Sequence, residues 1–173
     1  MKGIYSCLVA LLFLQNSVIS QAQAADDILK AVYAKAAMEN KKVLLIFHAS
    51  WCSWCKKMDA SLADTSIKKA IDKNYEIAHL TVYESKDKVA LENPGALDLL
   101  TKFGGADKGL PYWFVLDAGG NQLANSDYKP GSNSGCPASE EEVNYFINVL
   151  QKTAKLSPDE LEKVRRRFRK NEL

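Results

Sequence analysis

A run of five apolar residues, Val43–Phe47, constrains the fold of this chain more than any other feature. The run has no polar side to face water, and it is too short for a buried helix. Such a run is typical of a strand that is buried on both faces. The sequence therefore indicates a central sheet with helices packed on each side, which is an α/β fold.

The rest of the chain alternates between strand and helix patterns. Further strands are predicted at 75–83, at 110–117 and, after a turn, at 122–126. Helical patterns cover 26–42, a segment beginning at the Cys52–Cys55 motif, 95–103, 139–151 and an extra one from 157 onward. Early strands separated by helices pair in parallel, whereas a late hairpin is antiparallel. We expect a mixed sheet with helices on both faces and one additional C-terminal helix.

Two helix starts carry explicit signals. Asn93–Pro94 predicts an N-cap with proline at the first helical position, and Ser139 with Glu142 forms a capping box. The segment between the last strand and that capping box, 128–138, is rich in glycine and serine and is interpreted as a polar loop.

The first 24 residues have the pattern of a secretory signal peptide. Lys2 precedes the apolar run Cys7–Leu14, and Ala22-Gln23-Ala24 has the small residues of a cleavage site. The run is shorter than the roughly 20 residues of a membrane span. We expect cleavage after Ala24 and a periplasmic or secreted protein with no stable membrane span. The chain then divides into the signal peptide 1–24, a main domain 25–155 and a basic helical extension 156–173.

The charge balance excludes one class of partner. The full chain has a formal net charge of +2, and removal of Lys2 leaves +1. No broad basic face is available to neutralise phosphates, so we expect no binding to nucleic acid.

The C-terminal extension allows more than one interpretation. Its arginines could bind an acidic partner or a membrane surface, but the stripe Leu161, Val164 and Phe168 favours a docked helix with a solvated basic face. The terminal tetrapeptide KNEL is similar to a retention signal of the endoplasmic reticulum, which makes the lumen of that compartment a lesser alternative to the bacterial envelope.

Two cysteines, Cys52 and Cys55, lie three positions apart where the first strand gives way to a helix. Unpaired N–H groups and the positive end of the helix dipole stabilise a thiolate at that position. A second thiol three residues later can attack a mixed disulfide formed by the first. The spacing therefore favours thiol–disulfide exchange.

Other functions of the cysteine pair have weaker support in the sequence. A zinc site needs about four ligands, and only His48, His79 and Cys136 could add to the two thiolates. Covalent haem needs histidine after the second cysteine, where Lys56 stands. A structural bridge would close too small a loop to stabilise much. Cu(I) binding stays open because soft thiolates favour that ion. We expect no cofactor and no resident metal.

The segment VLLIFHASWCSWCKKMD (43–59) resembles the active-site segment of the thioredoxin family. The downstream KGLPYWFVLDAGGNQLA (108–124) is similar to that family's second hallmark, a cis-proline loop that opens a hairpin. The resemblance covers about residues 26–151 and implies a thioredoxin fold. The signal peptide and the extended C-terminus are more similar to exported, periplasmic members than to cytosolic thioredoxin.

The resemblance also implies roles for individual residues. Cys52 would be the attacking thiol, Cys55 the resolving thiol and Pro111 the proline of the substrate loop. Leu110 before that proline would tune specificity, and Trp51 would flank the site. The sequence departs from cytosolic thioredoxins between the cysteines, where Ser53 and Trp54 replace Gly-Pro, so the redox poise of the family does not transfer.

Three further positions bear on proton transfer. The family's buried aspartate, six residues before the first cysteine, is Ile46 here, and Glu84 or water could substitute for it. His48 replaces an aromatic residue and is interpreted as a histidine at the edge of the core.

Cys136, Trp54 and Trp113 each allow two interpretations. Cys136 could be a third exchanging thiol, but a free, partly buried loop cysteine is favoured. Trp113 lies within a strand and is predicted in the core, whereas Trp54 is predicted to be exposed at the site.

The sequence thus predicts an exported thiol–disulfide oxidoreductase that acts on protein disulfides or dithiols, with a slight preference for a reductase. Such a protein also needs a thiol electron donor or acceptor protein as its partner. The alternative is a binding module, either a Cu(I) carrier or a thioredoxin-fold adaptor without turnover.

Overall fold

The computed structural model describes residues 22–172, so most of the predicted signal peptide lies outside the described residues. The α-helices are α1 (Ala25–Glu39), α2 (Ser53–Leu62), α3 (Lys68–Asn74), α4 (Ala96–Lys102), α5 (Glu140–Thr153) and α6 (Pro158–Arg169). The strands are β1 (Lys42–His48), β2 (Tyr75–Thr81), β3 (Tyr112–Leu116), β4 (Gln122–Asn125), β5 (Asp127–Lys129) and β6 (Ser132–Asn133). Short 3₁₀ turns are η1 (Val89–Leu91) and η2 (Lys170–Glu172).

The central sheet has the strand order β2-β1-β3-β4. β1 pairs in parallel with β2 and antiparallel with β3, and β3 pairs antiparallel with β4. Leu44 in β1, for example, lies between Ile77 and Val115 of the two neighbouring strands. The predicted mixed sheet is confirmed.

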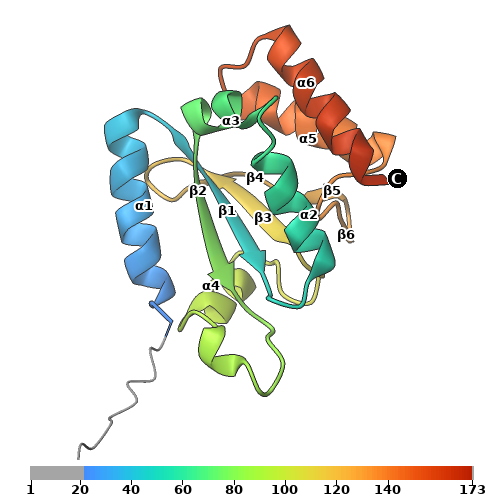
Figure 1. Ribbon diagram of the computed structural model, residues 1–173. Coiled ribbons are helices and arrows are strands. Elements are labelled where there is room, and N and C mark those ends of the chain that lie inside the picture. Colours follow the sequence, from blue (N-terminus) through green and yellow to red (C-terminus); the bar gives the residue numbers. More distant parts are fainter. Residues whose placement is uncertain (1–21, 173) are drawn as a thin grey trace, which may run out of the picture.

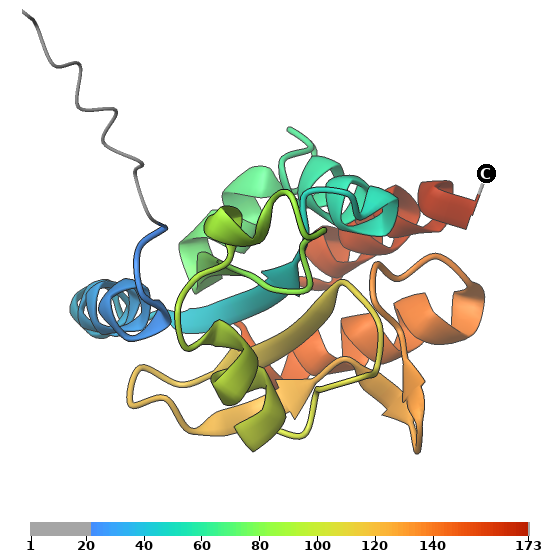
Figure 2. The same cartoon turned by 90° about the horizontal axis from the view of Figure 1, so that it is seen from below.

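Alternate residues of β1 enter two different hydrophobic clusters. Leu44 and Ile46 pack with side chains of α2, α3, α5 and α6, while Val43, Leu45 and Phe47 pack with α1 and α4. Figure 1 shows α5 and α6 side by side, and Figure 2 shows α1 on the opposite side of the molecule. Because β1 is covered on both faces, its continuous apolar run leaves no side chain to solvent.

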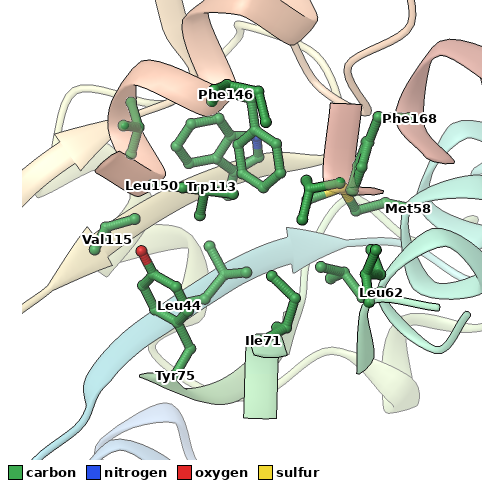
Figure 3. Close-up of a cluster of buried hydrophobic side chains, with 14 of the residues drawn as sticks. Leu44, Met58, Leu62, Ile71, Tyr75, Trp113, Val115, Phe146, Leu150 and Phe168 are labelled. Carbon is green, nitrogen blue, oxygen red and sulfur yellow. The ribbon is translucent and has the colours of Figure 1, made fainter. Parts of the chain in front are cut away.

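The extra C-terminal helix is docked, as its apolar stripe predicts. Leu161, Val164 and Phe168 are buried in the cluster on the α5 side of the sheet. The Phe168 ring lies 4.9 Å from that of Phe146, which in turn packs edge-on against Trp113 (Figure 3). The prediction that Trp113 belongs to the core is confirmed. Within residues 22–172, no helix combines the length and apolarity needed to cross a membrane.

One predicted helix start is wrong. α4 begins at Ala96, and its N-cap is Gly95, which has a positive φ of 82°. Asn93 instead accepts a hydrogen bond from the Thr81 amide at 2.7 Å, which ties the loop to the end of β2. The capping box of Ser139 and Glu142 at the start of α5 is confirmed.

Two short elements were not predicted from the sequence. The helix α3 follows α2 after a bend at Ala63–Ile67, so the segment before β2 contains two helices rather than one. The segment 128–138, interpreted as a polar loop, contributes to the small hairpin of β5 and β6. Both elements are short, so they contain too few residues for a hydrophobic periodicity to be recognised in the sequence.

Candidate active site

The two cysteines occupy the first turn of α2, directly after the end of β1. Cys52 is the N-cap, and its sulfur accepts a hydrogen bond from the Cys55 amide at 3.0 Å. The two residues form a disulfide, and they are only 3% and 2% exposed. No acidic residue lies in the first turn of α2, where its negative charge would offset the positive end of the helix dipole. Once reduced, Cys52 would therefore have its thiolate stabilised by the helix N-terminus.

Two tryptophans flank the disulfide and are exposed. Trp51 is 57% exposed and donates a hydrogen bond from Nε1 to the Tyr83 carbonyl at 2.7 Å. Trp54, between the cysteines, is 44% exposed, in agreement with the sequence prediction. Ser53, the first residue of α2, is exposed as well. The surface around the disulfide is thus apolar but open to solvent.

The loop before β3 approaches the disulfide from the other side. The Leu110–Pro111 peptide bond is cis, as the resemblance implies. Leu110 packs against the small cluster formed by Ala49, Cys52 and Cys55. The structure therefore brings together two segments that lie more than 50 residues apart in the sequence.

A groove of about 220 Å³ opens beside Trp54 and Leu110. Part of its lining comes from the segment 133–138, which leads from β6 into α5; we call this segment the groove loop. The groove is lined by Trp54, Gly109, Leu110, Asn133, Ser134, Gly135, Cys136, Ala138 and Glu142. An extended chain that reached the disulfide would have this groove beside it.

Asn133 is a structural residue of the site that the sequence interpretation missed. Its amide nitrogen lies 3.1, 3.2 and 3.0 Å from the carbonyl oxygens of Lys108, Gly109 and Pro111. The side chain thereby holds the Pro111 loop against the groove loop. No local pattern marks this asparagine, because its partners lie 22 to 25 positions earlier in the chain.

The positions considered for proton transfer have different surroundings. Ile46 is buried in the core beneath α2. The Glu84 carboxylate accepts hydrogen bonds from the amide and the hydroxyl of Ser50, so it braces the turn before Trp51. His79 is hydrogen-bonded through Nε2 to Asp59 Oδ1 at 2.8 Å. Asp59 lies on α2, one turn after Cys55.

His48 lies at the end of β1, half-buried, as its interpretation at the core edge predicts. Its ring centroid is 5.1 Å from that of His79, and its Nε2 is 3.2 Å from Thr81 Oγ1. Burial lowers the pKa of His48 below the ordinary 6.5, and the neighbouring His79 lowers it further.

Cys136 is free and buried, as favoured from the sequence. Burial raises the pKa of its thiol to about 12, so the thiol is neutral at ordinary pH. Among residues 22–172, no three His, Cys, Asp or Glu side chains gather as a group that could hold a metal ion.

Comparisons with known proteins agree with this architecture. The sequence matches the family described as thioredoxin-like over residues 23–118, more than half of the chain. The structure resembles a disulphide isomerase from Xylella fastidiosa Temecula1, with 20% identity and a TM-score of 0.52 over 85% of this chain and 90% of that one. Because the identity is low, this likeness bears on the fold alone.

Weaker structural likenesses include the oxidised DsbD C-terminal domain of Neisseria meningitidis, at 23% identity, TM-score 0.43, and coverage of 61% of this chain and 84% of that one. A DsbH oxidoreductase has 19% identity, TM-score 0.45, and coverage of 87% and 95%. No curated protein matches the sequence. The chain belongs to the thioredoxin-like family, and its fold and its Cys52–Cys55 pair support thiol–disulfide oxidoreductase activity.

Proposed function

We propose that this protein reduces disulfides of protein substrates in the cell envelope, with Cys52 as the attacking thiol and Cys55 as the resolving thiol. The observation that carries the proposal is the Cys52–Cys55 disulfide at the N-terminus of α2. Leu110, packed against the pair, and the adjoining groove provide the contact surface that a protein substrate needs.

The exchange proceeds in two steps that together transfer two electrons. The Cys52 thiolate attacks a substrate disulfide, forms a mixed disulfide and displaces one substrate thiolate, which takes up a proton. Cys55, deprotonated, then attacks the Cys52 sulfur, forms the intramolecular disulfide and releases the second substrate thiolate. The oxidised pair is returned to the dithiol by a thiol electron donor, which is itself oxidised.

The residues around the pair have distinct parts in this proposal. Trp51, Trp54 and Ser53 form the exposed rim on which the substrate rests, and Leu110 and Pro111 line its other side. The backbone of the Pro111 loop offers hydrogen bonds to an extended substrate chain. A buried Cys136 with a strongly raised pKa takes no part in exchange.

The two cysteine roles are tested by trapping the intermediate. The Cys55→Ser variant is expected to accumulate a mixed disulfide with a peptide disulfide, because the resolving step is removed. The Cys52→Ser variant is the matched control and should form none. Intact-mass spectrometry under non-reducing conditions measures both. Equal trapping by the two variants would contradict the assignment of Cys52 as the attacking thiol.

Direction is tested by the equilibrium reduction potential of the pair, titrated against a thiol buffer in a Cys136→Ser background. Potentials of such pairs run from roughly −270 mV for reductants to about −120 mV for oxidants. We expect a value near the reducing end. A value near the oxidising end would make the protein a disulfide donor or isomerase. The absence of any reversible transition, together with stoichiometric Cu(I) binding by the reduced protein, would favour the copper carrier.

Export is supported by the sequence pattern of residues 1–24 and by the start of α1 at Ala25, the residue after the proposed cleavage point. N-terminal sequencing of the protein from a periplasmic extract is expected to begin at Ala25. An intact Met1 in the cytoplasmic fraction would contradict export.

A further inference from the structure

The C-terminal turn η2 lies between the helix that carries the cysteines and the groove loop. Its central residue, Asn171, is only 5% exposed. We propose that Asn171 is a positioning residue for substrate binding. It holds the groove loop at a fixed distance from α2. The inference rests on the proposed function, because it assigns a task to a groove that is used only if a protein substrate binds there.

The first set of contacts joins Asn171 to α2. Its side-chain nitrogen donates to Ser61 Oγ at 3.0 Å, and Ser61 is fully buried. The Ser61 hydroxyl in turn donates to the Lys57 carbonyl at 2.7 Å, within the same helix. The main-chain oxygen of Asn171 accepts from Lys57 Nζ at 3.0 Å. Asn171 is thus bound to α2 at two points, one turn apart.

The second set joins the same amide to the groove loop. The side-chain nitrogen lies 3.3 Å from Cys136 Sγ and 3.3 Å from the Pro137 carbonyl oxygen. Cys136 also lines the groove, as Trp54 does. One buried amide therefore connects the groove loop to α2.

Arg167 fixes the orientation of the amide. Its Nη1 donates to Asn171 Oδ1 at 3.1 Å, and its Nε is paired with Asp64 at 2.9 Å. A guanidinium can only donate, so the amide oxygen faces Arg167 and the nitrogen faces Cys136 and Pro137. The hydroxyl of Ser61 lies within reach of both amide atoms, 3.2 Å from the oxygen and 3.0 Å from the nitrogen. The orientation of the Asn171 amide therefore follows from the positive charge of Arg167.

The contact with Lys57 extends the effect to the rim of the site. Lys57 Nζ lies 4.5 Å from the centroid of the Trp54 ring, so the ammonium bound to the Asn171 carbonyl also rests on that tryptophan. Trp54 and the groove loop both line one groove. The turn η2 thus contacts the groove loop directly and Trp54 through Lys57, and its loss would leave both free to move.

The test compares a substrate that needs the groove with one that does not. A two-chain peptide disulfide with a fluorophore and a quencher fills the groove, whereas bis(2-hydroxyethyl) disulfide reaches only the sulfur atoms. For Asn171→Ala we expect KM for the peptide to rise about fivefold, the effect of losing roughly one net hydrogen bond. We expect kcat for the peptide and the rate with the small disulfide to stay unchanged.

A second readout follows the groove loop directly. With Cys52 and Cys55 oxidised, a maleimide can label only Cys136 among residues 25–172. Native labelling of Cys136 is expected to be faster in Asn171→Ala than in the wild type. Ser61→Ala, which removes one side of the tie and keeps Asn171 in place, should change the peptide KM in the same direction. This variant keeps the test valid if Asn171→Ala folds poorly.

Val164→Ala is the matched control. It weakens the packing of α6 through a buried side chain that makes no hydrogen bond. An equal rise of the peptide KM in Val164→Ala would overturn the inference, since helix docking alone would then set the groove. An unchanged KM in Asn171→Ala, beside an active wild type, would also overturn it. A wild type that turns over neither disulfide would instead refute the proposed function, and the inference would fall with it.

Discussion

At the scale of single residues, the neighbourhood of His48 couples stability to pH. The imidazole is half-buried beside His79, and Asp59 and Glu84 are the acidic groups near enough to act on it. Burial and the charge of His79 lower the pKa of His48, and the two carboxylates oppose that change without reversing it. The fold therefore holds His48 in its neutral form more strongly than the unfolded chain does.

The direction of the pH effect follows from that difference. As pH falls, His48 in the unfolded chain takes up its proton near 6.5, before His48 in the folded protein does. The contribution of His48 to stability is thus fully present above pH 6.5 and is lost as pH falls toward its lower folded pKa. We expect His48→Gln to lose less stability than the wild type between pH 7.5 and pH 5. Urea unfolding at both pH values measures this, and equal losses would show that His48 is not the sensor.

Residues with local partners were the ones the sequence could predict. The cysteine pair and Pro111 belong to short motifs, and each motif can be recognised without knowledge of the fold. Asn133 and Asn171 escaped prediction because the partners that connect them to other segments of the fold lie 22 to 114 positions away. The sequence around an isolated asparagine in a polar segment does not show whether its side chain joins two distant segments by hydrogen bonds or is an ordinary turn residue.

At the scale of elements, helix starts were predictable where side-chain chemistry alone decides them. Ser139 and Glu142 form a reciprocal cap, and both hydrogen bonds are present. Asn93–Pro94 has an equally suggestive pattern, but the strand end at Thr81 competes for the asparagine oxygen. Gly95 then starts α4 with a backbone conformation that glycine adopts easily. Tertiary contacts overrode the local preference.

The cap of α5 supports a quantitative prediction. Ser139→Ala removes the acceptor for the Glu142 amide, and loss of such a cap typically costs about 1 kcal/mol. Ser139→Asn is the matched variant, because asparagine caps as well as serine and should stay close to the wild type. The free energy of unfolding from urea titration checks both. If the two variants were equally destabilised, the packing of the serine rather than its cap would be responsible.

At the scale of the whole molecule, the extra helix α6 completes the core on one face of the sheet. Its buried stripe joins side chains of β1, α2, α3, β3 and α5 in a single cluster. Its polar side is held by ion pairs, of which Arg167–Asp64 reaches the loop after α2. The sequence predicted that the stripe would dock, but not where, since helical periodicity says which face is apolar and not which surface receives it.

The docking of α6 can be measured through Phe168, whose ring contacts Phe146 at the centre of that cluster. Truncation of a buried phenylalanine typically costs about 3–5 kcal/mol, through lost burial and the cavity left behind. We expect Phe168→Ala to lower the free energy of unfolding by that amount. Arg166→Ala is the control, because its side chain is 63% exposed and its nearest acidic partner is 3.9 Å away. A cost below about 1 kcal/mol for Phe168→Ala would mean that α6 is an accessory helix instead of part of the core.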